Sequence, residues 1–434
     1  MPRVRAWQRV RTCRDSTSGP GVADFTAGQP ISLLTQATLA DGSVVDVEVG
    51  RQGADGIVTA VRPSAGPATG DGVLDLSGHL LLTAPAEPHA HLDKALSFDE
   101  LRPEPGDLHH SIATWKAGSA RFDEHSFRRR ARAAALAMLR NGTTAVRTHV
   151  DVLAGADPLR GIRAVDAVRR ELRGLMDIQI VALIKAYSDV ELLYGALDAG
   201  ADLVGGSPHS APDPAAELER LLGVAEDRGV GADLHTDEFL HGDHHTLPGF
   251  ADRVIRWPGD RMRTASHCTR LSMMTAAELD DLLPRIAASG LGVVANPITN
   301  LYIHARDVPT ATPRGIAPLQ RLRDAGVPVA AGADNVRDPF NPLGRSDALE
   351  TAMLTVVAAH LPPHDALALV TDEARAVIGL PQAGPRRGAR ADLLAVRGTS
   401  VPDVIANAPA DRVVIHDGNL VSRSVTDTWT AAQG

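Results

Sequence analysis

Side chains that bind divalent metal ions occur at distant places in this chain of 434 residues. His89 and His91 form a His-x-His pair, and residues two apart on an extended segment point to the same side, so both imidazoles can reach one ion. His235 and Asp334 each follow a short apolar run. Three imidazoles and one carboxylate leave a position for water, which is typical of a catalytic metal site. Such ligands suit Zn²⁺, Fe²⁺ or Mn²⁺, and the residues do not choose among these ions.

Two further titratable side chains could move protons or stabilise charge at such a site. The expected role of the ion is to lower the pKa of a bound water toward about 7. Glu238, three residues beyond His235, is the candidate general acid and base for a leaving nitrogen. His267 is the candidate group that stabilises developing charge. The structural alternatives are an acid at a helix N-terminus for Glu238 and a hydrogen-bonded rim histidine for His267.

Other side chains are candidates for supporting and substrate-binding roles. We expect His149 and Asp151 to brace the metal ligands rather than to bind the ion. The candidate substrate contacts are Lys185, Asn335 and Phe340. For Lys185 the alternative is a side chain that turns outward or pairs with a nearby acid.

The elements that position these residues follow one repeated pattern. A helical segment ends at a Gly, which readily adopts the left-handed backbone that stops a helix, and a short apolar run follows. These glycines are Gly142, Gly200, Gly229, Gly290 and Gly326. With three further apolar runs, the sequence predicts eight strands, at residues 80–84, 143–146, 176–183, 201–204, 231–234, 263–266, 292–295 and 327–331.

Eight strands that alternate with helices predict an α/β fold with a parallel sheet, closed into a (β/α)₈ barrel. The candidate residues follow the strands, at the rim where active sites of such barrels lie. Short strands near both termini predict a small β-sandwich built from both ends. The predicted units are a disordered arm at residues 1–30, the composite sandwich at 31–86 plus 376–434, and the catalytic barrel at 87–375.

The composition limits the classes of partner. The formal net charge of −9 argues against nucleic-acid binding and against binding to an anionic membrane surface. No apolar run is long enough to span a membrane. The two cysteines, Cys13 and Cys268, give no disulfide framework, so a reducing cytoplasm is the expected location. We expect a small-molecule substrate and a homo-oligomer.

Eight short stretches of the chain, taken in order, resemble the cytosine deaminase branch of the amidohydrolase superfamily. They are residues 87–93 (EPHAHLD), 146–151 (VRTHVD), 177–182 (DIQIVA), 233–238 (DLHTDE), 264–267 (TASH), 294–297 (VANP), 332–339 (GADNVRDP) and 342–344 (PLG). The resemblance implies a metal bound by His89, His91, His235 and Asp334. It also implies Glu238 as proton shuttle, His267 as polarising group, and Asp334 as acceptor of a proton from the attacking water.

The resemblance further implies a reaction: hydrolytic removal of an amino group from an aromatic nitrogen heterocycle, which yields an oxo product and ammonia. Two departures point away from cytosine. Lys185 stands where cytosine deaminases carry a Gln, and Asn335 stands where they carry a second Asp. Residues 334–338 (DNVRD) are more similar to relatives that hydrolyse N-alkylated triazines.

Both departures make the pocket less negative, and a Lys is a strong partner for a carboxylate or an anionic oxo group. We therefore expect an oxo-rich or anionic ring as substrate. One alternative is hydrolysis of a cyclic amide or of an N-alkylamino heterocycle by the same centre. A second alternative is a metal-binding module that has lost catalysis.

Overall fold

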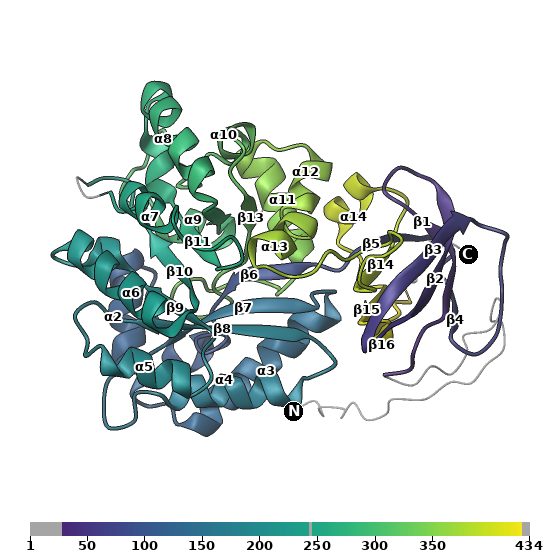
Figure 1. The fold of residues 1–434 in the computed structure, drawn as a ribbon, viewed down its shortest axis with the longest axis horizontal. Helices are drawn as coiled ribbons and strands as arrows, with labels where there is room; N and C mark the ends of the chain where they lie inside the picture. The colour runs from purple at the N-terminus through teal and green to yellow at the C-terminus, as the bar shows by residue number, and fades with distance from the viewer. Residues whose placement is uncertain (1–27, 243–244, 428–434) are drawn as a thin grey trace, which may run out of the picture.

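The structure, a computed structural model, describes residues 28–242 and 245–427. Most of the predicted N-terminal arm lies outside the described residues. Figure 1 shows two sheets, a barrel surrounded by helices on the left and a second sheet on the right. The two sheets correspond to the predicted α/β barrel and to the predicted β-structure built from both termini.

The barrel is a run of eight parallel strands, each paired with the next along the chain. In order they are β6 (Ala86–Ala90), β7 (Ala145–Asp151), β8 (Asp177–Ile184), β9 (Leu203–Gly206), β10 (Gly231–Thr236), β11 (Arg263–His267), β12 (Gly292–Ala295) and β13 (Val329–Ala331). The barrel closes where Ala90 forms a parallel bridge with Asp334 and the Asp334 amide donates to the His89 carbonyl at 2.9 Å. This seam brings the first and last ligand-bearing segments together.

The first barrel strand lies later in the chain than predicted. The predicted run at residues 80–84 forms strand β5 (His79–Thr83), which pairs with β14 (Leu393–Arg397) and β1 (Leu33–Thr38) in the second sheet. The barrel begins instead at β6, which contains the His-x-His motif. The prediction was wrong because residues 80–84 (LLLTA) form a mostly apolar run, whereas β6 (AEPHA) carries the polar side chains of Glu87 and His89.

Helices cover the outside of the barrel and connect its strands (Figure 1). They are α1 (Phe98–Leu101), α2 (Leu108–Ser119), α3 (Glu124–Arg140), α4 (Arg160–Glu171), α5 (Glu191–Asp198), α6 (Pro214–Arg228), α7 (Leu247–Val254), α8 (Ala276–Ser289), α9 (Pro297–Ile303), α10 (Leu319–Asp324), α11 (Ala348–Ala359), α12 (Pro363–Ala368) and α13 (Asp372–Val377). Two short 3₁₀ turns, η1 (Pro208–Ser210) and η2 (Thr269–Met273), follow β9 and β11.

Local signals explain where the helices begin and end. Helix α8 starts with a capping box, in which Thr275 and Glu278 each bond the other's backbone amide, and it ends at Gly290 with φ +67°. Helix α3 ends just before Gly142, whose φ is +107°. A Cβ there would lie 2.6 Å from a methyl of Leu394, so both conformation and space require glycine. The predicted helix-Gly-strand pattern is confirmed at these positions.

The second sheet joins strands from both ends of the chain in the order β16-β15-β14-β5-β1-β2-β3, with β4 paired to β1. Its remaining members are β2 (Val44–Gln52), β3 (Asp55–Pro63), β4 (Val73–Asp75), β15 (Arg412–His416) and β16 (Asn419–Ser424), and α14 (Val401–Asn407) connects β14 to β15. A separate apolar core fills this unit, with Leu34, Val58 and Ile415 completely buried.

A buried ion pair links the barrel helices to the second sheet. Arg375 on α13 donates to Asp392, just before β14, at 2.6 Å, and each side chain is 1% exposed. Burial alone would raise the pKa of Asp392, but the hydrogen bond and charge of His416, with the charges of Arg375 and Arg390, hold this pKa below its usual range. The pair therefore stabilises the fold above the pKa of an unfolded Asp, and this stability is lost as pH falls through the folded value.

We expect Arg375→Met to lower the free energy of unfolding by about 3 kcal/mol at neutral pH, because it removes a buried cationic partner of the Asp392 carboxylate. Urea denaturation measures this change. The matched control is Arg321→Met, which breaks an ion pair to Asp280 between side chains that are 40% and 67% exposed and should cost less than about 1 kcal/mol. Equal losses in the two variants would contradict a special role for the buried pair.

Within the described ranges, no helix has the length and apolar character needed to cross a lipid bilayer.

Candidate active site

The four predicted metal ligands meet at one end of the barrel. His89 lies on β6, His91 follows that strand directly, His235 lies on β10, and Asp334 lies three residues beyond β13. The Asp334 Oδ1 atom is 3.2 Å from His91 Nε2 and 3.6 Å from His89 Nε2. The Nε2 atoms of His235 and His91 are 3.3 Å apart. All four side chains are buried.

These separations fit the donor set of one tetrahedral ion. Ligand atoms at 2.0–2.2 Å from a tetrahedral metal lie about 3.3–3.6 Å from each other. His89 Nε2 and Asp334 Oδ1 are buried without a hydrogen-bond partner among the described residues. His91 Nδ1 lies 3.1 Å from the His149 carbonyl and 3.0 Å from Lys94 Nζ, and the His91 Nε2 atom lies 3.2 Å from Asp334 Oδ1. A cation at the centre of these atoms would satisfy every one of them.

The protonation states also suit metal binding. Burial lowers the pKa values of His89, His91 and His235 well below the usual histidine range, and neighbouring histidines and Lys94 lower them further. The imidazoles are therefore neutral at neutral pH, and the neutral form is the one that binds a metal.

Three residues that follow barrel strands adopt left-handed backbone conformations. Asp334 has φ +63°, His267 has φ +70° and Asp237 has φ +49°. Such a conformation costs a residue other than glycine about 1–2 kcal/mol, and strained residues of this kind cluster at functional sites. In Asp334 and His267 this backbone conformation directs the side chain toward the group of predicted metal ligands.

Glu238 and His267 lie beside each other at the edge of this cluster. His267 Nδ1 is 3.2 Å from Glu238 Oε1 and 3.1 Å from Asn300 Nδ2. Burial raises the pKa of Glu238 well above its usual range, and the charge of Asp334 adds to the rise. Burial lowers the pKa of His267 to about 3. The site therefore places an acid with a raised pKa beside an imidazole with a lowered pKa, which suits proton transfer to a leaving group.

His149 and Asp151 lie close to the predicted ligands His89 and His91. The ring of His149 packs against His89 with centroids 4.1 Å apart, and its Nε2 is 3.5 Å from Asp233. Asp151 accepts a hydrogen bond from Lys94 Nζ at 2.6 Å, and Lys94 Nζ is 3.0 Å from His91 Nδ1. Asp151 is thus linked to the predicted ligand His91 through Lys94.

The three candidate substrate contacts have partners other than the four predicted ligands. Asn335 is buried and donates to Asp338 at 2.7 Å, and Phe340 packs at the edge of an aromatic group that includes Trp115. Lys185, directly after β8, is exposed and lies beside Lys116 of α2. Among residues 28–242 and 245–427, no hydrogen bond or ion pair joins Lys185, Asn335 or Phe340 to the four ligands.

Sequence reasoning missed Glu87 as a site residue. Its carboxylate accepts from the His89 amide and from the Ala333 amide, each at 3.0 Å, so it ties the first ligand segment to the last across the barrel seam. Burial raises its pKa to about 8. Its position two residues before His89, on the same side of the strand, was a usable signal.

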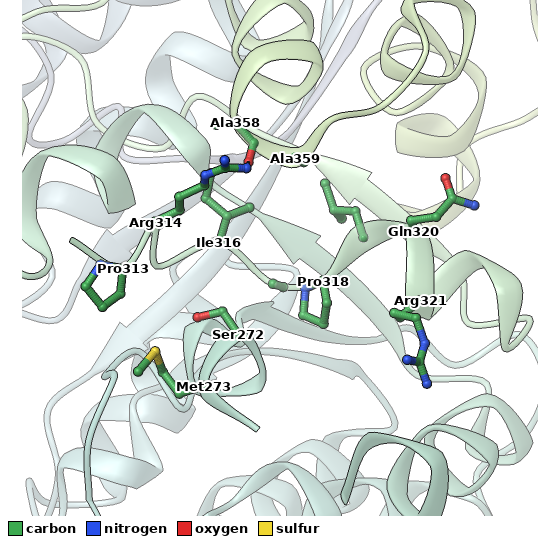
Figure 2. A pocket seen from close by; sticks show the side chains of 12 residues that line it. Ser272, Met273, Pro313, Arg314, Ile316, Pro318, Gln320, Arg321, Ala358 and Ala359 are labelled. Atoms are coloured by element: carbon green, nitrogen blue, oxygen red, sulfur yellow. The ribbon is translucent and has the colours of Figure 1, made fainter. Parts of the chain in front are cut away.

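A groove of about 550 Å³ is lined by residues other than the predicted metal ligands (Figure 2). Segments from η2, from residues 313–318 and from α10 line it, together with the end of α11. Arg314 and Arg321 are its charged lining residues. None of the predicted site residues contributes to it.

Comparison with known proteins places this architecture in one family. Residues 111–431 match the model of the amidohydrolase family. A pterin deaminase of Rhizobium rhizogenes is 28% identical over 386 residues, which cover 86% of this chain and 88% of the relative.

Two solved structures agree over nearly their full length. The 5-methylcytosine deaminase of Klebsiella pneumoniae, bound to 5-fluorocytosine, has a TM-score of 0.83 and 27% identity, with 93% of this chain and 100% of that chain covered. N-isopropylammelide isopropylaminohydrolase of Burkholderia multivorans has a TM-score of 0.75 and 30% identity, with 90% and 98% covered. The chain therefore belongs to the amidohydrolase family.

Proposed function

We propose that this protein is a metal-dependent hydrolase that replaces an amino group on a nitrogen heterocycle by an oxo group and releases ammonia. The observation that carries the proposal is the convergence of His89, His91, His235 and Asp334, with separations of 3.2–3.6 Å between neighbouring donor atoms. Glu238 and His267 stand beside these four at hydrogen-bond distance from each other. Family membership supports hydrolysis of C–N bonds as the reaction type.

A divalent ion held by these four residues would supply Lewis-acid activation of water, and Zn²⁺, Fe²⁺ and Mn²⁺ all suit the donor set. Asp334 is placed to accept a proton from the attacking water, because its Oδ1 lies beside the predicted ligand nitrogens and has no hydrogen-bond partner among the described residues. Glu238, whose pKa burial raises well above its usual range, is placed to protonate the departing nitrogen. His267 is placed to hydrogen-bond the substrate as charge develops on the ring.

Deamination is favoured because the pterin deaminase and the 5-methylcytosine deaminase both match this chain over most of their length. Release of an alkylamine is the second candidate, because the N-isopropylammelide isopropylaminohydrolase is 30% identical. Both reactions place water on a ring carbon and expel an amine, so one site serves either.

An ammonia-release screen tests the proposal. Metal-loaded protein is incubated with aminopyrimidines, aminotriazines, aminopurines, pterins and creatinine-like rings, and products are identified by mass spectrometry. We expect ammonia together with a product 1 Da heavier than its substrate, as replacement of NH₂ by OH requires. A ring-opened product 18 Da heavier, without ammonia, would favour cyclic-amide hydrolysis, and failure on every ring would favour a catalytically inactive binding module.

We further propose that the ring is oxo-rich or anionic. Lys185, directly after β8, lies beside Lys116 of α2, and the pKa of Lys185 is lowered by its hydrogen bond to Lys116 and by the charge of that lysine. Two adjacent lysine side chains, one of them directly after a barrel strand, favour an anion nearby.

Lys185→Gln is expected to raise KM for an anionic ring about 5-fold and to leave KM for a neutral ring within about 2-fold, since an exposed ion pair contributes roughly 1 kcal/mol. Steady-state kinetics with a matched pair of neutral and carboxylated substrates measures this. An unchanged preference between the two substrates would defeat the assignment.

A further inference from the structure

A chain of buried hydrogen bonds runs from the metal cluster into the barrel interior. His89 Nδ1 lies 2.9 Å from Ser266 Oγ, and the Ser266 hydroxyl donates to Asp233 Oδ1 at 2.9 Å. Arg147 donates to Asp233 Oδ2 at 3.0 Å. All four side chains are completely buried, and they come from β6, β11, β10 and β7.

The donor and acceptor groups of these four side chains allow the hydrogen bonds to be donated in one direction only. Arg147 has donors only, so it directs hydrogens at Asp233. A carboxylate only accepts, so the Ser266 hydrogen points to Asp233 and the Ser266 oxygen offers its lone pairs to His89. The hydrogen of His89 is thereby drawn to Nδ1. Its Nε2, which has no partner among the described residues and faces Asp334, keeps its lone pair.

We propose that Ser266 and Asp233 are positioning residues, which set the tautomer and the orientation of His89 so that its Nε2 binds the ion. This inference rests on the metal site proposed above. The Nδ1 atom of His89 contacts a side chain, that of Ser266, whereas the Nδ1 atom of His91 contacts a backbone carbonyl, that of His149. Groups that orient a ligand imidazole in this way contribute about 10–100-fold to metal affinity.

The first test is Ser266→Ala, which removes the acceptor of the His89 proton without changing any charge. We expect the dissociation constant for Zn²⁺, measured by competition with a chromophoric chelator, to rise about 10–100-fold. The visible spectrum of the Co²⁺-loaded variant should also differ from that of the wild type, because the imidazole is free to rotate or to change tautomer.

The matched control is Thr264→Val, also on β11. Thr264 is equally buried, and its hydroxyl accepts from Arg147 at 2.9 Å but does not contact His89. This variant removes one buried hydroxyl from the same strand. Zn²⁺ affinity and the Co²⁺ spectrum should stay those of the wild type, even if the free energy of unfolding falls by a similar amount in both variants.

The second test reverses the direction in which the buried hydrogen bonds are donated. In Asp233→Asn, Arg147 still requires an acceptor and holds the amide oxygen, so the amide NH₂ faces Ser266. The Ser266 hydroxyl must then donate to His89 Nδ1, which places the imidazole hydrogen on Nε2, the atom that should bind the ion. We expect Zn²⁺ affinity to fall at least as much as in Ser266→Ala.

The outcomes separate this inference from the proposed function. Weaker Zn²⁺ binding and a changed Co²⁺ spectrum in Ser266→Ala, with Thr264→Val unchanged, support the positioning role. Wild-type affinity and spectrum in a folded Ser266→Ala overturn the role and leave the metal site standing. A wild-type protein that binds neither ion overturns both.

Discussion

Glu238→Gln is expected to lower kcat by about 10²–10⁴-fold, the usual contribution of a general acid. Glutamine keeps the size of the side chain but cannot release a proton to a leaving nitrogen. Glu238 is not among the four predicted ligands, so metal content should stay at the wild-type level. KM should change little, because the interaction that is lost forms as the nitrogen departs.

Steady-state kinetics and elemental analysis of the same sample measure the two effects. Glu278→Gln is the control, because that acid belongs to the exposed capping box of α8 and should affect only stability. A Glu238→Gln enzyme within about 10-fold of the wild-type rate would rule out a general acid at this position.

Asp334→Asn is expected to have a larger effect, because this residue combines two roles in the proposed site. Its Oδ1 lies 3.2 Å and 3.6 Å from two ligand nitrogens and has no other partner among the described residues. The amide has no negative charge to hold a cation and cannot take a proton from water. We expect a loss of bound metal and a fall in kcat of more than about 10³-fold, beyond the middle of the general-base range.

Asp338→Asn is the matched control for this change. Asp338 is buried four residues further along the same segment, and it accepts from Asn335 and from the Phe340 amide. Its replacement alters a neighbouring carboxylate without touching the predicted ligands. Metal content should therefore survive in Asp338→Asn and be lost in Asp334→Asn, and equal metal content in the two variants would count against Asp334 as a ligand.

The fold follows from local signals that the sequence displays. Gly142 and Gly290 end helices because the backbone there is left-handed, and each precedes an apolar run that becomes a strand. The prediction of the first barrel strand was wrong because residues 80–84 are mostly apolar, as barrel strands are, while β6 carries the polar residues Glu87 and His89. Which sheet an apolar strand joins depends on distant partners, and local patterning does not carry that information.

Some features of the candidate site could likewise be predicted from the sequence, and others could not. The ligand segments could be predicted because each follows or ends a strand, and strand ends meet at one rim of a barrel. The contact from His89 to Ser266 could not be predicted from the sequence, because it joins residues 177 positions apart through the barrel interior. Whether Lys185 points into the barrel or outward depends on side-chain conformation after β8, and the structure places it in solvent.

X-ray absorption spectroscopy at the metal edge of the purified protein tests the central claim most directly. We predict one divalent ion per chain, with nitrogen and oxygen scatterers at about 2.0–2.2 Å and the multiple scattering of several imidazoles. A sulfur shell, or full hydrolytic activity in protein that retains less than about a tenth of an equivalent of metal, would contradict the account.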